Sequence, residues 1–216
     1  MLYIYNNGVK KYQRFGEIST NLDKAIYPYE TEEEAYPTCL KWGNRKNFFQ
    51  LSIADDKGNI LIIDVRTGRQ IKEIKAAQTL INTLDIEPAE NKLLAVGTMN
   101  ARILLYEINK DDKKSKGKHM EEEDQKDDQS VYKLVGHNGG VLCCKFLSDK
   151  YLISGGSDAA VCVWDLENSH KYLSMYTEHN SDCVSMNAYK EDSNIFVTGS
   201  SDLTAKIWDI RIKDPV

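Results

Sequence analysis

Residues 151–165 read YLISGGSDAAVCVWD, and residues 195–209 read IFVTGSSDLTAKIWD. Both stretches hold an aliphatic and β-branched run, a turn of Gly, Ser and Asp, and a second such run that ends in Trp-Asp. Runs of this kind between turn residues are typical of consecutive antiparallel strands. The sequence therefore predicts a repeated β-unit, and no helical period competes with it.

The spacing of the repeat indicates the architecture. Trp164 and Trp208 lie 44 residues apart, within the period of roughly 40–45 residues of a four-stranded propeller blade. Residues 38–64 and 81–106 repeat the same run–turn–run shape with less of the signature. We therefore expect an all-β, WD-repeat β-propeller with about four to five blades in one domain, 1–216. The expected units are about 1–16 (partial), 38–75, 79–135, 137–178 and 179–216 (incomplete).

The first and last expected units each contain only part of a blade. Residues 2–5 and 9–15 predict a hairpin across Asn7-Gly8 that forms the outer half of an earlier blade, and residues 17–37 would then be a long connection. An open arc exposes the edges and apolar faces of its end blades. We therefore expect a partial or truncated propeller whose ring is completed by missing blades or by another chain.

A quartet of polar residues recurs in the last two units. A Ser or Thr lies four residues before an Asp, a Trp lies six residues after it, and a His precedes the set. Such side chains can form a buried hydrogen-bonded chain anchored on the turn Asp. We expect structural tetrads at His137, Ser154, Asp158 and Trp164 and at His179, Thr198, Asp202 and Trp208.

The same residue types also occur in catalytic, metal and phosphate sites, but their arrangement here does not fit such sites. A His-Ser-Asp set is also the triad of hydrolases, but here it occurs twice with a Trp each time, so we expect no catalytic residues and no enzyme. The four histidines lack metal-ligand spacing, and His119 fits a solvated residue beside an acidic run. Gly139-Gly140 and Gly155-Gly156 lack phosphate-binding patterns, and we expect no metal and no cofactor.

Residues 110–129 form a charged insertion, with lysines followed by acidic residues. A segment without aromatic or branched aliphatic side chains cannot bury enough apolar area to offset its ordering entropy. We expect a solvated loop between the third and fourth strands of its blade. A docking element for an oppositely charged partner is the alternative.

Composition restricts the partners and the compartment. The net charge of −5 gives no general attraction to nucleic acid or to an anionic membrane, and no apolar stretch is long enough to span a bilayer. Recognition of RNA or histone tails by the propeller face is kept as a further option. The five cysteines lack CxxC spacing and predict small buried side chains in a reducing compartment. We expect a cytoplasmic protein, membrane-peripheral only through partners.

The chain resembles the WD-repeat family, and within it the β subunit of heterotrimeric G proteins. Residues 136–147 (GHNGGVLCCKFL) are similar to that subunit's third blade, and residues 194–211 (NIFVTGSSDLTAKIWDIR) are similar to its fourth. The resemblance covers roughly the last third of the chain; upstream, residues 39–43 are only weakly similar. It implies a partner-binding face, with Asp182 at an acidic position and Met99 and Val184 at apolar positions that contact Gα and effectors.

Other positions depart from that subunit. Leu80 stands in place of a large aromatic residue, Asn82 in place of methionine, Gly140 in place of tyrosine and Tyr36 in place of a basic residue. Residues 1–35 lack the heptad spacing of the helix that binds the γ subunit, so γ binding is not expected. Asp182 also fits a simply solvated residue at the entrance of a strand.

These observations lead to a non-catalytic scaffold that binds other proteins through its propeller face. The first expectation is a protein resembling a G-protein β subunit in signal transduction, with Gα as partner. The alternative is a WD-repeat scaffold of another complex, such as a cytoskeletal or ciliary assembly or a ubiquitin ligase.

Overall fold

The computed structural model describes residues 3–5, 12–14, 35–44, 49–108, 130, 132–168 and 171–212. Three expectations fall outside these residues: the solvated state of the 110–129 insertion, the environment of His119, and the turn at Asn7-Gly8. The strands on both sides of the insertion are described, and they are the third and fourth of their sheet.

Four antiparallel sheets follow one another along the chain, each with its strands in sequence order. The first sheet holds β3 (Pro37–Trp42), β4 (Gln50–Asp55), β5 (Asn59–Asp64) and β6 (Arg69–Lys75). The second holds β7 (Ile81–Ile86), β8 (Leu93–Thr98), β9 (Arg102–Glu107) and β10 (Tyr132–Val135). The third holds β11 (Val141–Phe146), β12 (Tyr151–Gly156), β13 (Val161–Asp165) and β14 (Lys171–Tyr176). The fourth holds β15 (Cys183–Ala188), β16 (Ile195–Ser200) and β17 (Ala205–Asp209).

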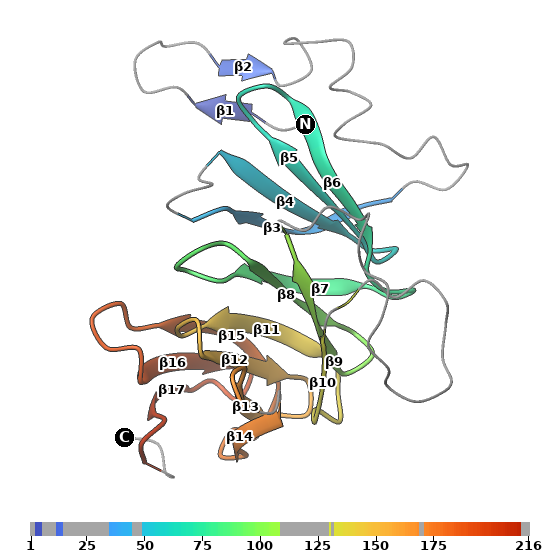
Figure 1. The fold of residues 1–216 in the computed structure, drawn as a ribbon. Helices are drawn as coiled ribbons and strands as arrows, with labels where there is room; N and C mark the ends of the chain where they lie inside the picture. Colours follow the sequence, from blue (N-terminus) through green and yellow to red (C-terminus); the bar gives the residue numbers. More distant parts are fainter. Residues whose placement is uncertain are drawn as a thin grey trace.

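The four sheets stack as successive propeller blades (Figure 1). The first strands of the sheets, β3, β7, β11 and β15, contact one another in that order, so they form the inner edge of the arc. The described residues contain no helix and therefore no helix that could span a membrane. The expected all-β, partial propeller is confirmed, with four blades of three or four strands.

The N-terminal residues add a short two-stranded sheet. β1 (Tyr3–Tyr5) pairs antiparallel with β2 (Tyr12–Arg14), with Tyr3 opposite Arg14 and Tyr5 opposite Tyr12. The pairing is that of the expected hairpin.

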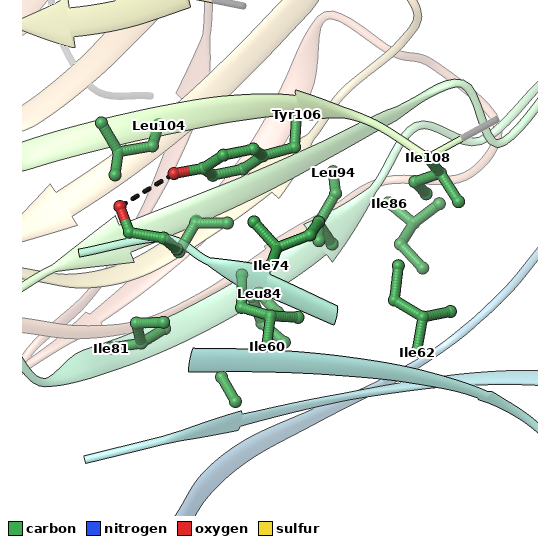
Figure 2. Close-up of a cluster of buried hydrophobic side chains, with 13 residues drawn as sticks. Ile60, Ile62, Ile74, Ile81, Leu84, Ile86, Leu94, Leu104, Tyr106 and Ile108 are labelled. Carbon is green, nitrogen blue, oxygen red and sulfur yellow. Dashed lines mark hydrogen bonds between the residues drawn. The ribbon is translucent and has the colours of Figure 1, made fainter. Parts of the chain in front are cut away.

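Apolar side chains fill the space between neighbouring blades. Between the first two blades, Ile60 and Ile74 meet Ile81 and Leu94, all of them buried (Figure 2). Branched aliphatic residues suit this place because their stiff side chains pack well on a pleated surface. Each fully buried side chain of this size contributes about 1.5–3 kcal/mol, so blade–blade contact is a main source of stability.

Candidate protein-binding face

The same pair of loops meets at one edge of every blade. Successive strands alternate in direction, so the turn between the second and third strands and the connection into the first strand lie on one face, here called the turn face. In each blade an N–H of the turn donates to a carbonyl of the connection, at 2.9–3.0 Å. The donor–acceptor pairs are Asp56 and Tyr36, Met99 and Leu80, Ser157 and Gly140, and Ser201 and Asp182.

The third blade holds a continuous buried hydrogen-bonded chain behind this face. His137 Nδ1 lies 3.0 Å from both carboxylate oxygens of Asp158, and its Nε2 lies 2.8 Å from Ser154 Oγ. Trp164 Nε1 donates to the same Oγ at 2.8 Å. Because the Asp158 carboxylate can only accept, Nδ1 carries the imidazole proton, and the Ser154 hydroxyl therefore donates to Nε2.

The fourth blade repeats this chain with Thr in place of Ser. His179 contacts Asp202 Oδ2 and Thr198 Oγ1, both at 2.8 Å. Trp208 Nε1 donates to Thr198 Oγ1 at 2.7 Å. Thr198 and Trp208 are both 1% exposed. Both quartets identified in the sequence are thus brought together, each by strands of a single blade and its incoming connection.

Hydrogen bonds hold both anchoring aspartates ionised. Burial raises the pKa of Asp158, but the Asn138 N–H and the His137 imidazole outweigh it, so the pKa lies below its ordinary 3.8. At Asp202 the Thr204 hydroxyl, followed by the Asn180 N–H, holds the pKa well below its usual range. The two turns are therefore fixed by ionised carboxylates at neutral pH.

In the third blade, both hydrogen-bonding roles of the Ser154 hydroxyl are already taken by neighbouring side chains. Ser154 is 0% exposed, and its oxygen already accepts from Trp164 and donates to His137. Gly156 is packed against the same group, since a Cβ there would lie 2.5 Å from Asp158 Oδ1 and 2.8 Å from His137 Nδ1. A substrate has no access to this oxygen, which supports a structural role.

The first two blades fill the equivalent positions differently. In the first blade, Ile53 and Ile63 lie where the strand register of the third places Ser154 and Trp164, and they belong to an apolar cluster. In the second, Tyr106 takes the Trp position, and its hydroxyl donates to Ala76 O at 2.9 Å (Figure 2). The His–Ser/Thr–Asp–Trp chain is thus replaced by an apolar cluster in the first blade and by a tyrosine hydrogen bond in the second.

In every blade, the pairing between the first and second strands has a register shift near the start of the first strand. The shift lies at the second residue of that strand, close to the turn face. The residues at the shift are Thr38, Asn82, Leu142 and Val184. Thr38 donates to Ile81 O of the next blade at 2.6 Å, and Asn82 donates to Val141 O at 2.9 Å. Asn82, which replaces an expected partner-binding methionine, therefore joins two blades. This role could not be predicted from the sequence, because the register shift appears only in the paired strands of the folded chain.

The three candidate partner-binding residues share the turn face but not one blade. Met99 lies in the second blade, 51% exposed, and packs beside Gly140, where a Cβ would come within 2.8 Å of its sulfur. Asp182 and Val184 lie in the fourth blade, at the connection into β15, and Val184 is 49% exposed. Among the described residues, the Asp182 side chain has no hydrogen-bond or ion-pair partner. All three therefore remain available for contact, with the third blade's loops between them.

Sequence analysis missed a charged group on the inner edge. Asp85 of β7 is 2% exposed and forms ion pairs with Lys41 of β3 and with Lys145 of β11, the latter at 3.4 Å. Its other oxygen accepts from Phe146 N at 2.7 Å. These residues are far apart in the sequence, and only the stacking of the first three blades brings them together.

The cysteines fit the predicted role as small buried side chains. Cys143, Cys144, Cys162 and Cys183 are buried, and Cys39 is half-buried. Burial raises the pKa of Cys144 and that of Cys162 to about 12, so both thiols stay protonated at neutral pH and are poor nucleophiles. In the part of the chain that the structure describes, no three His, Cys, Asp or Glu side chains are grouped as a metal site would require.

The chain is similar in sequence to known guanine nucleotide-binding protein β subunits. The chain is 30% identical over 138 residues to a guanine nucleotide-binding protein subunit beta of Schizosaccharomyces pombe, covering 64% of this chain and 39% of that protein. The subunit beta of Oryza sativa subsp. japonica is 25% identical over 181 residues, covering 80% and 44%. The chain thus spans less than half the length of these relatives.

A solved structure and a family model cover more of the chain. A chain in the crystal structure of the mitotic checkpoint complex superposes with a TM-score of 0.70 at 22% identity, covering 87% of this chain and 54% of that one. The model of the nucleolar protein 10-like N-terminal domain, a β-propeller, matches residues 36–216. With four stacked blades and two buried His–Ser/Thr–Asp–Trp chains behind one loop face, the protein belongs to the nucleolar protein 10-like N-terminal domain family of WD-repeat β-propellers.

Proposed function

We propose that this protein is a non-catalytic platform that binds other proteins through the turn face. The observation that carries the proposal is the repeated loop frame, in which identical backbone bonds present different side chains. Tyr36, Met99 and Val184 are 60%, 51% and 49% exposed on this face, and Asp182 adds a charge two residues before Val184. Loops held on a rigid scaffold are the usual place for recognition.

The first candidate partner is the α subunit of a guanine nucleotide-binding protein. Two kinds of observation support it: the relatives named as β subunits, and the presence of Met99, Asp182 and Val184 at the positions that the resemblance assigns to Gα and effectors. In this interpretation the chain acts in signal transduction in the cytosol. A γ subunit is not part of the proposal, because residues 1–35 lack heptad spacing.

A WD-repeat subunit of a different assembly is the second candidate. Asn82 and Gly140 lie at two of the expected partner positions, but both have structural roles. The Asn82 side chain donates a hydrogen bond to the next blade, and Gly140 leaves room for Met99. The matched family is named for a nucleolar protein. Imaging of a tagged chain tests the nucleolar form of the second candidate, because a nucleolar signal would support it over the first.

Size-exclusion chromatography with light scattering tests the first candidate directly. Chain 1–216 is mixed with purified Gα loaded with GDP, and a single peak with the summed mass supports it. Asp182→Lys should weaken the complex at least tenfold, whereas Tyr189→Ala, at an exposed residue on the opposite face, should leave it unchanged. Folded chain that elutes separately from Gα would overturn the G-protein candidate.

A further inference from the structure

One turn of the turn face carries a residue whose conformation does not suit it. The third residue of each turn between second and third strands has a positive φ: 90° at Gly58, 64° at Ala101, 61° at Ala159 and 69° at Leu203. Glycine adopts this left-handed conformation freely, but a side chain on Cβ disfavours it, and a bulky residue there is unusual. The fold has a Gly or Ala at this position in three blades and a Leu in the fourth.

Nothing within the described fold compensates for this leucine. Its side chain is 97% exposed, so it buries almost no apolar area against the rest of the chain. A single exposed leucine needs no explanation, and a single strained residue can be a local compromise. A leucine that is both strained and exposed gains nothing for stability, and such backbone outliers occur preferentially at functional sites.

The surrounding turn holds Leu203 in place. Asp202 accepts from the Thr204 hydroxyl at 2.6 Å and from Asn180 N at 3.0 Å. Ser200 Oγ donates to Ser181 O at 3.0 Å. The Leu203 side chain is therefore presented on a fixed backbone, which lowers the entropy lost when a partner binds it.

Two acidic groups lie in the connection that touches this turn. The Asp182 backbone carbonyl accepts from Ser201 N, while its carboxylate has no partner among the described residues. Glu178 of the same connection has a buried carboxylate oxygen, Oε2, without a hydrogen-bond partner. A basic group of another molecule can reach the Asp182 carboxylate, whereas Glu178 Oε2 is buried within the chain and adds negative charge to the connection without being accessible.

We propose that Leu203 is an anchor for a partner protein: it enters an apolar pocket of the partner whose rim carries a Lys or Arg side chain that pairs with Asp182. This rests on the proposed function and adds the fourth-blade turn, beside Val184, to the binding face. The Leu side chain supplies buried apolar area, and the Asp182 carboxylate supplies charge complementarity.

Two substitutions at position 203 separate binding from folding. Leu203→Ala keeps a residue that the equivalent turns already accept, so its melting temperature should stay within about 1 °C of the wild type. Leu203→Gly removes the conformational strain and should raise the melting temperature by about 1–3 °C. Both should weaken the complex with Gα·GDP on the order of 10- to 100-fold in titration calorimetry, the effect of losing one buried leucine.

The outcomes distinguish this inference from the function on which it rests. Tyr189→Ala serves as the control, with unchanged affinity, and Asp182→Asn should reduce the salt dependence of binding because one ion pair is lost. If wild type binds Gα·GDP and both Leu203 variants bind equally well, the inference is wrong and the proposed function stands. If the wild type does not bind Gα·GDP, the inference falls together with the G-protein candidate, while the proposed protein-binding platform stands on its second candidate. A lower melting temperature for Leu203→Gly would also overturn the inference, since Leu203 would then be stabilising the fold.

Discussion

Removal of the Ser154 hydroxyl should destabilise the protein far more than the loss of one oxygen atom suggests. In Ser154→Ala the indole N–H of Trp164 loses its acceptor and Nε2 of His137 loses its donor, both at 2.8 Å in the wild type. These groups are 0% and 6% exposed, so water does not readily replace the hydroxyl. Each unsatisfied buried group costs about 1–3 kcal/mol, which gives a loss of about 2–6 kcal/mol for the two groups together.

Urea and thermal unfolding measure this loss. For a chain of this size, 1 kcal/mol corresponds to about 2–4 °C in melting temperature, so we expect a decrease of about 4–24 °C. Ser154→Thr is the rescue variant, because the fourth blade uses Thr198 in the same geometry, and it should stay within about 1 kcal/mol of the wild type. Ser157→Ala, at an exposed serine of the same blade, is the control. If Ser154→Ala is no less stable than Ser157→Ala, the buried chain is not a stabilising feature.

Three further changes test other parts of the fold. Tyr106→Phe leaves the Ala76 carbonyl without its buried donor and should cost about 1–2 kcal/mol in urea unfolding. Asp85→Asn leaves two lysines facing each other across the inner edge and should cost about 1–3 kcal/mol, less than a fully buried pair because the lysine side chains are 24% and 28% exposed. The pKa of Asp158 is lowered from 3.8 in the fold, so its contribution is complete above that value and is lost as the pH falls below it. Asp158→Asn should therefore flatten the decrease in melting temperature below about pH 4.

Each of these has an outcome that contradicts it. Equal stability of wild type and Tyr106→Phe would mean that water satisfies the carbonyl. A more stable Asp85→Asn variant would mean that desolvation of the carboxylate outweighs its ion pairs, as happens at some buried sites. An acid transition of unchanged steepness in Asp158→Asn would mean that other carboxylates, Asp202 first, dominate the pH dependence.

The features that could be predicted from the sequence are those encoded within one repeat. Ser154 and Asp158 lie four residues apart, and Trp164 follows six residues later, so a fixed strand–turn–strand brings them to one place in every blade that carries them. The strand boundaries follow for the same reason, since the Gly, Ser and Asp residues of each turn end the branched aliphatic runs.

The contacts between repeats could not be predicted in this way. Asp85 meets Lys41 and Lys145 only because β3, β7 and β11 stack side by side, and all three residues look like ordinary polar strand positions. The first blade is harder still to recognise from the sequence, because Ile53 and Ile63 occupy the positions of Ser154 and Trp164. The polar signature of the repeat is lost there, although the strands and turns are the same.

The turn face shows how a repeated fold can acquire specificity at small cost. Its backbone bonds are the same in all four blades, so the side chains at equivalent positions can change without disturbing the frame. Asn82 looked from the sequence like a lost binding residue, yet its side chain donates a hydrogen bond to the next blade. Among the described residues, Leu203 alone combines a positive φ with nearly full exposure. Departures from a related family therefore have to be interpreted position by position, against the structural work that each position performs in this chain.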